Sequence, residues 1–485
     1  MEQPAHETIA PDEQREAVSG DRMETPNHPD DHNFDQPNGP NGCSPGRGNE
    51  TPKNPEPEPE PELESSSLLE NLPAELRDHI LFSMPDLLTL QTLVRASPMM
   101  HAQYRSNRNA ILGAAVAREL DGFLVDAYAC AMSRRHAIGK PRTKEKIIAH
   151  LDAYRGWMSG SQIDVDAIRP SYVRWLSAFH LDIIKPMAHQ YSTWALQNLS
   201  RATSPAQDQG TVETPAVPQP DVALSRSEEI RIFQALYRYE TYYHLFGFKS
   251  LAERQDILHL NEINNNFFGL FNPWEGEAVG CIDIFIRQRY HQIFDDVQDD
   301  LHAANPDLDF RDDTKHNEGS IYACTQREDS IDGAVARGLR PTIDVFTTED
   351  RETLVAKVHK YIRPSVLLDD PIRRTLLPAV QAQRRSTHPD ARDEAERRKD
   401  VMEFAGDAVP PNGPPLGWVL LWNGTYVNIY GEHVPPTVQK WGYVMWDERR
   451  WSELEAKTLV LKQWETEPDR IKDIEIFYGW KPSGF

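Results

Sequence analysis

An abrupt change of pattern at Leu68 constrains the fold of this chain more than any other feature. From there to about Leu199, apolar residues recur at the spacing of three and four that places them on one face of an α-helix. A second helical block has the same pattern on one face, in Ile230, Phe233, Leu236 and Tyr237. We therefore expect a mainly α-helical, multi-helical fold.

The segment before this change, residues 1–66, has a composition that opposes folding. It contains 16 acidic and 4 basic residues and 12 of the 37 prolines of the chain. A segment with so few large apolar side chains cannot bury enough surface to offset the entropy lost on ordering. We expect a disordered acidic tail, in which the alternating proline and glutamate of residues 55–61 form a stiff spacer.

The net charge of the chain limits the classes of partner that it can bind. Its 485 residues include 52 Lys and Arg against 75 Asp and Glu, a net charge of −23. Nucleic acid and anionic lipid attract positive surfaces, so we expect neither as a general partner. No apolar run is long enough to predict a membrane span, and the first residues do not resemble a secretory signal. The four cysteines are too widely spaced to predict a disulfide framework or a zinc site, which suits a reducing compartment. We expect a cytoplasmic or nuclear protein.

Composition divides the chain after the tail into five parts. Residues 67–199 and 224–380 have helical patterns, and residues 200–223 between them form a polar linker or loop that contains proline. Residues 381–416 are polar and rich in proline, which is typical of another loop. Residues 417–485 are rich in tryptophan and predict a small α+β part.

The strongest strand signal lies in this last part. Residues 419–422 and 425–430 flank Asn423-Gly424, the dipeptide that supplies the positive φ angles of a type I′ turn. Residues 441–446 are a candidate for a third strand. We therefore expect a small C-terminal β-hairpin or sheet in an otherwise helical protein.

Residues 72–105 predict three short helices. Pro73 suits the first turn of a helix, where its missing amide hydrogen is not needed, and Pro85 ends that helix. Asp86 is placed to cap the second helix, and Ser97 with Pro98 after it is placed to cap the third. So small a unit has little core of its own, so it must pack on the rest of the chain or on a partner.

This stretch resembles the F-box, in the form found in many fungal F-box-like proteins. The resemblance rests on a Leu-Pro-x-Glu-Leu start, a leucine-rich second helix and a Val-x-x-Ser step before the third helix. The matching residues are Leu72, Pro73, Glu75, Leu76, Ile80, Leu81, Leu87, Leu90, Val94 and Ser97. The resemblance covers less than a tenth of the chain.

In that family the Leu-Pro pair and apolar residues of these helices bind the Skp-type adaptor of a cullin–RING (SCF-type) ubiquitin ligase, while the rest of the chain captures a substrate. The resemblance therefore implies a substrate-recognition function by protein–protein interaction, with no cofactor and no catalysis. It implies adaptor contacts at Leu72, Pro73, Ile80, Leu81 and Val94. The alternative is a helical scaffold with no ubiquitin role, in which the same segment is buried against residues 106–199.

An acidic cluster raises a remote alternative, a magnesium-dependent enzyme. Asp295, Asp296 and Asp299 match the D-D-x-x-D motif of helical prenyl-diphosphate and terpene enzymes, in which carboxylates one turn apart hold the metal. No second metal motif or basic diphosphate clamp accompanies the cluster, and no nucleotide, zinc or serine-hydrolase motif occurs. In so acidic a chain, such a cluster is typical of a solvated helix face, and we expect no metal site there.

The tryptophans of residues 417–485 are the other candidate site. Trp is favoured at protein interfaces because it combines a large apolar area with one hydrogen-bond donor. A partner interface would use Trp418, Trp422, Trp441 and Trp446. The alternative is that these side chains fill the core of this part, since most Trp residues are largely buried.

Overall fold

The computed structural model describes residues 69–139, 142–160, 163–203, 223–247, 258–304, 330–361, 372, 391–407, 413–426 and 433–478. The chain divides into two units, Met1–Glu60 and Pro61–Phe485, and every described residue belongs to the second. The predicted N-terminal tail, residues 1–66, lies outside the described residues.

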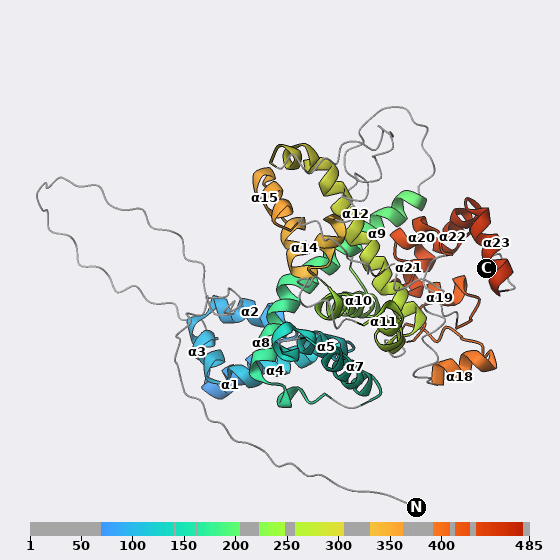
Figure 1. Cartoon of the computed structure of the whole chain (residues 1–485). Helices are drawn as coiled ribbons and strands as arrows, with labels where there is room; N and C mark the ends of the chain where they lie inside the picture. The colour runs from blue at the N-terminus through green and yellow to red at the C-terminus, as the bar shows by residue number, and fades with distance from the viewer. Residues whose placement is uncertain are drawn as a thin grey trace, which may run out of the picture. The chain divides into compact units, whose positions relative to one another are not determined.

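The described residues are mainly helical, as predicted (Figure 1). The N-terminal elements are α1 (Ala74–Phe82), α2 (Leu87–Ala96), α3 (Pro98–Ser106), α4 (Arg108–Glu119), α5 (Leu124–Ser133), α6 (Arg135–Ile138), α7 (Lys144–Met158), η1 (Val165–Ala167), α8 (Pro170–Phe179), η2 (His180–Ile184) and α9 (Lys185–Thr203). The middle elements are α10 (Arg226–Phe246), α11 (Leu260–Asn266), η4 (Phe268–Leu270), α12 (Pro273–Ala304), α14 (Leu339–Phe346) and α15 (Arg351–Tyr361). The C-terminal elements are α18 (Ala391–Arg398), α19 (Leu416–Leu421), α20 (Pro436–Lys440), α21 (Glu448–Glu453), α22 (Ala456–Glu465) and α23 (Pro468–Tyr478). No helix in the described ranges combines the length and apolar character needed to span a bilayer.

Helix α10 forms the centre of the core. It begins at a capping box, in which the side chains of Ser225 and Glu228 each bond the backbone amide of the other. Its side chains are buried along nearly its whole length, and it packs against α5, α9 and α12. A helix buried on all sides must pair its charges, and Arg238 does so with Asp126 at 2.7 Å and Glu275 at 2.8 Å.

Helices α8 and α9 are joined without a break by η2, which is a π-turn. The Lys185 amide donates to the His180 carbonyl, a bond between residues five apart. Pro186 accounts for this change of pitch, because proline lacks an N–H and clashes with the carbonyl four residues earlier in a regular α-helix. At 3.6 residues per turn, His180 and Lys185 would point roughly 140° apart, and the π-turn brings them together.

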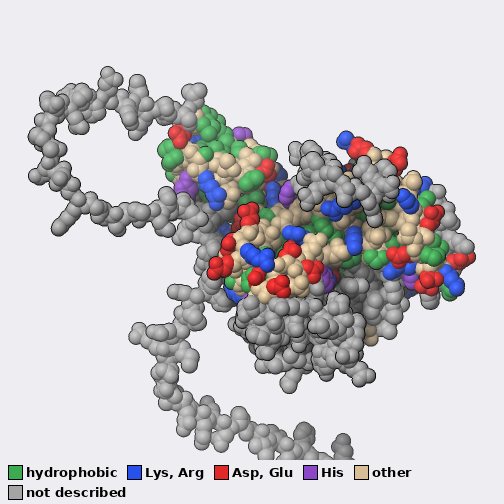
Figure 2. Space-filling model, turned by 90° about the horizontal axis from the view of Figure 1, so that it is seen from above, with side chains coloured by type: hydrophobic (Ala, Val, Ile, Leu, Met, Phe, Trp, Pro, Cys, Tyr) green, Lys and Arg blue, Asp and Glu red, His purple; other side chains and the backbone are tan. Residues whose placement is uncertain are grey.

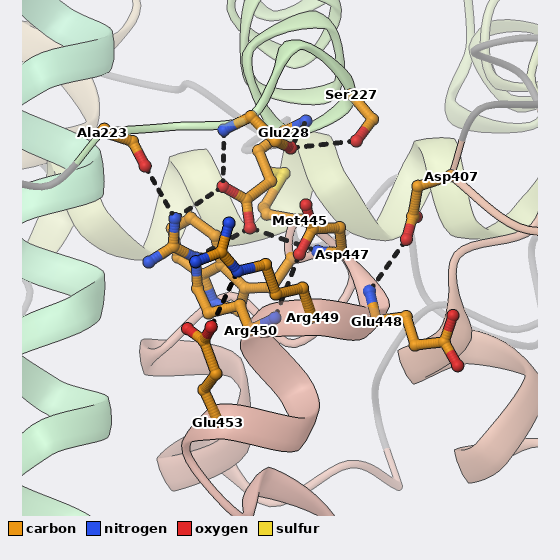
Figure 3. A network of polar contacts seen from close by, with 12 residues as sticks. Ala223, Ser227, Glu228, Asp407, Met445, Asp447, Glu448, Arg449, Arg450 and Glu453 are labelled. Carbon is orange, nitrogen blue, oxygen red and sulfur yellow. Dashed lines mark hydrogen bonds and ion pairs between the residues drawn. The ribbon is translucent and has the colours of Figure 1, made fainter.

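A buried carboxylate joins the C-terminal part to α10 (Figure 3). Glu228 is fully buried, and its carboxylate accepts hydrogen bonds from Nε and Nη2 of Arg450, each at 2.7 Å. The Asp447 amide donates to the same carboxylate at 3.2 Å. Such a bidentate pair fixes orientation as well as distance, so the start of α10 and the start of α21 are held together.

The expected C-terminal β-hairpin is not seen. Residues Leu416–Leu421, before Asn423, form helix α19. Residues 441–445 form a turn after α20, and the described residues contain no strand. Asn423 and Gly424 do have positive φ angles, 50° and 67°. Here they end a helix, because the Gly424 amide bonds the Val419 carbonyl at 3.0 Å, as in a Schellman motif. Residues 427–432 of the proposed second strand lie outside the described residues.

The polar stretch 381–416 also differs from expectation, since part of it is helical. Residues Ala391–Arg398 form α18, with Asp393 and Glu394 in the first turn and Arg397 and Arg398 in the last. This order of charges matches the helix dipole at both ends. Acidic residues at the start and basic residues at the end are the helix signal within this polar stretch.

Candidate functional site

The three-helix segment, α1 to α3, forms at the predicted residues. Pro73 is the N-cap of α1, and Asp86 caps α2 by accepting the Thr89 amide at 2.7 Å. Ser97 caps α3 by accepting the Met100 amide at 3.2 Å, with Pro98 as the first helical residue. These caps satisfy amides that the helices themselves cannot satisfy, so the local sequence determines where each helix begins.

The inner side of this segment packs on α4, which contacts all three helices. Two of the proposed adaptor contacts, Leu81 and Val94, lie on this side with exposed fractions of 1% and 6%. The other buried apolar side chains are Leu87, Leu90, Met100 and Tyr104. Leu81 and Val94 are therefore core residues and are not available to a partner in this structure.

The outer side of the segment leaves large apolar side chains in solvent. Leu76, Leu88 and Met99 are 49%, 54% and 43% exposed, and they are three of the five large apolar residues found exposed in the described ranges. Apolar side chains gather on this part of the surface in Figure 2. Of the other proposed contacts, Pro73 is exposed, while Leu72 and Ile80 are half-buried. Exposed apolar residues concentrated in one short segment are typical of an interaction site.

Two adjacent residues of α4 hold the corner between α1 and α2. Arg118 donates to the carbonyl of Phe82 at 2.7 Å and to that of Met84, beyond the C-terminal end of α1. Glu119 accepts the Leu87 amide, the first of α2, at 3.0 Å. A cation at a helix C-terminus and an anion at an N-terminus both match the helix dipole. Arg118 and Glu119 therefore form a corner clamp, which no sequence motif predicts.

The Glu119 carboxylate has two further partners across the π-turn. Its Oε1 lies 2.7 Å from Nζ of Lys185 and 3.2 Å from Nε2 of His180. Burial raises the pKa of Glu119, but hydrogen bonds from His180, Lys185 and Leu87 outweigh it and lower the pKa to about 2. Glu119 is therefore ionised at neutral pH.

His180 is a neutral partner in this arrangement. Its side chain is fully buried, and burial lowers its pKa even though Glu119 acts in the opposite direction. The contact with Glu119 assigns the hydrogen to Nε2, which leaves Nδ1 to accept from the Tyr237 hydroxyl 3.1 Å away. Lys185 is then the charged partner of Glu119.

The acidic cluster on α12 lies on a solvated face. Asp295, Asp296 and Asp299 are all exposed. The neighbouring Asp300 forms an ion pair with Arg351 of α15 at 2.6 Å, and Arg351 also donates to the Asp296 carbonyl. Within the described part of the chain, no group of three or more His, Cys, Asp or Glu side chains is arranged to hold a metal ion.

The C-terminal tryptophans form a core. Trp418, Trp422 and Trp441 are fully buried and Trp446 is 1% exposed, so they do not form an exposed partner interface. The Trp418 and Trp422 ring centroids are 5.4 Å apart, and the Trp441 ring contacts that of Trp451 with centroids 5.5 Å apart. The indole of Trp441 donates to Gln463 at 3.0 Å, which satisfies a buried donor inside the chain.

Ser133, His244 and Glu240 form a hydrogen-bonded chain that no motif predicts. The Ser133 hydroxyl lies 2.9 Å from His244 Nδ1, and His244 Nε2 lies 3.2 Å from Glu240 Oε1. This order of groups is that of a hydrolase triad. Ser133, however, is fully buried and lies 2.8 Å from the Cys130 carbonyl. A fully buried hydroxyl is not accessible to a substrate from solvent. We therefore interpret these contacts as structural links between α5 and α10.

Comparisons of the chain with models of protein families, with curated proteins and with solved structures found no match. The candidate site therefore rests on the residues of the three-helix segment and on its geometry. Its exposed side, together with the corner clamp that holds it, is the site that these residues support best.

Proposed function

We propose that this protein is an F-box-like substrate-recognition adaptor, which binds the Skp-type adaptor of a cullin–RING ubiquitin ligase through its three-helix segment. The proposal assigns no catalysis, metal or cofactor to the chain. The observation that carries it is the concentration of exposed apolar residues, Leu76, Leu88 and Met99, on a short segment whose sequence resembles the F-box.

The contact surface proposed here differs from the one that the resemblance implies. Pro73 remains a contact because it is exposed, and Leu72 and Ile80 remain at its edge because they are half-buried. Leu76 and Leu88 replace Leu81 and Val94, because a buried side chain gives a partner no area to cover. Burying exposed apolar side chains supplies the binding free energy in such an interface.

A second function, a helical scaffold without a ubiquitin role, is favoured by a different observation. Leu81 and Val94 pack on the chain's own core, and the corner clamp holds the segment there. In this alternative the segment is one more part of the helical body. The two functions differ in whether the exposed side of the segment binds an adaptor.

The test is binding of the purified full chain to a purified Skp-type adaptor, measured by calorimetry. Leu76→Asp/Leu88→Asp introduces charge into the proposed interface, and we expect it to weaken binding at least about a hundredfold. The matched control is Val401→Asp/Ile476→Asp, since these two side chains are 78% and 65% exposed outside the segment. The control is expected to bind like the wild type.

Two results would count against the proposal. A folded wild-type chain that does not bind the adaptor would favour the scaffold. Binding weakened equally by both double variants would place the interface elsewhere or show a general effect of added charge.

A further inference from the structure

We infer that Glu119, held by Lys185 and His180, positions the three-helix segment on the rest of the chain and so sets how well its exposed side binds a partner. The inference rests on the proposed function for the identity of that partner. Its structural part, the dependence of the α1–α2 corner on Glu119 and Lys185, can be tested without any partner.

Glu119 joins three elements through one side chain. One carboxylate oxygen accepts the first amide of α2, at Leu87, and the other contacts His180 of η2 and Lys185 of α9. The side chain of Glu119 is only 6% exposed. A buried carboxylate whose contacts are all with protein groups is held in place, because moving it would leave a buried charge without its partners.

Lys185 affects the α1–α2 corner only through Glu119. Its ammonium is the charged partner of Glu119, and no hydrogen bond or ion pair in the described structure joins it to α1, α2 or α3. Without that charge, the Glu119 carboxylate would face only neutral donors in a buried place, which is unfavourable. The carboxylate relieves this by turning toward water, which breaks its bond to the Leu87 amide.

The π-turn explains why two donors reach one oxygen. His180 and Lys185 are five residues apart and are joined by a backbone bond, and both side chains meet Oε1 of Glu119. Pro186 imposes this turn from the following position. The π-turn thus places both donors where they bind the Glu119 carboxylate, which in turn holds the corner between α1 and α2.

The corner lies between the two proposed interface residues of α1 and α2, Leu76 and Leu88. If the corner loosens, these two side chains no longer hold one relative position. A partner then binds only the fraction of molecules in which the two side chains have the correct relative position. The apparent affinity is reduced in proportion to that fraction.

The experiment compares four full-length proteins: wild type, Glu119→Ala, Lys185→Met and Lys185→Arg. Hydrogen exchange is measured at the amides of residues 84–90 other than Pro85, which has none, and affinity for a purified Skp-type adaptor is measured by calorimetry. We expect Glu119→Ala and Lys185→Met to speed this exchange and to weaken binding, each by about tenfold. Lys185→Arg retains the charge and is expected to stay close to the wild type.

Unchanged exchange at residues 84–90 in both Glu119→Ala and Lys185→Met would overturn the inference, whatever the adaptor does. Faster exchange with unchanged adaptor affinity would overturn its link to binding. If no variant and no wild type binds the adaptor, the proposed function fails, and the exchange data still decide whether Glu119 and Lys185 hold the corner. A cooperative unfolding transition in each variant ensures that local loosening is being measured.

Discussion

The three-helix segment and the tryptophan-rich C-terminal part are both rich in apolar residues, but they differ in how far their large apolar side chains are buried. The N-terminal segment leaves Leu76 and Leu88 about half exposed, at 49% and 54%. The C-terminal part buries Trp418 and Trp422 completely. The largest apolar side chains of the C-terminal part are therefore core residues, whereas Leu76 and Leu88 of the three-helix segment remain available to a partner.

The difference shows that residue type does not identify an interface by itself. Tryptophan is common at interfaces and also fills cores, and here neighbouring helices and aromatic rings cover it. The short helices α1 to α3 can cover only one side of themselves by packing on α4. Their outer apolar residues stay exposed because nothing else in the described structure packs there.

The largest contrast is expected from truncation in the two regions. Trp418→Ala removes a fully buried ring and should lower the free energy of unfolding by about 3–5 kcal/mol. Leu88→Ala removes a side chain that is more than half exposed and should change it by less than about 0.5 kcal/mol. Urea unfolding of the two variants checks this. Similar losses in both would contradict the assignment of one region as core and the other as surface.

A smaller effect is expected from the charge of Glu119. Its pKa is lowered from 4.5 to about 2, so its ionised form stabilises the folded chain at pH values above 4.5. That contribution should be lost as the pH falls from 4.5 toward 2. The difference in unfolding free energy between wild type and Glu119→Gln should shrink over this range. A difference that stays constant down to pH 2 would mean that the carboxylate is not held as described.

A loss of about 1–2 kcal/mol is expected from Gly424→Ala, which tests the helix end in the C-terminal part. The φ of Gly424 is +67°, and a β-carbon there would lie 2.8 Å from the Met402 carbonyl oxygen. Gly113→Ala is a suitable control, because a β-carbon at Gly113 meets no atom within 4 Å and its φ is not positive. The control should be neutral or slightly stabilising, and equal losses in both would argue against this helix end.

The smallest effect concerns the caps of the three-helix segment. Ser97→Ala removes the side chain that caps α3 and should lower the free energy of unfolding by about 1 kcal/mol. Ser97→Thr retains a hydroxyl that can accept from the Met100 amide and donate to Glu70, and it serves as the comparison. If the alanine and threonine variants were equally destabilised, the loss would have a cause other than the hydrogen bonds of this hydroxyl.

Much of the three-helix segment could be predicted because its signals are local. Asp86 and Ser97 each bond an amide three residues away, so the sequence alone indicates where α2 and α3 begin. The corner clamp could not be predicted, because Glu119 and Leu87 are far apart in sequence. The failure at Asn423-Gly424 has another cause: positive φ angles end helices as well as form hairpins, and only the tertiary context separates the two.

Hydrogen exchange of the full chain with and without a purified Skp-type adaptor tests binding through α1 and α2 most directly. We predict that the adaptor slows exchange in α1 and α2, at residues 74–82 and 87–96, and leaves residues 416–465 unchanged. Slowed exchange that maps to the C-terminal part, or no change anywhere under conditions in which the adaptor binds a known partner, would contradict adaptor binding through α1 and α2.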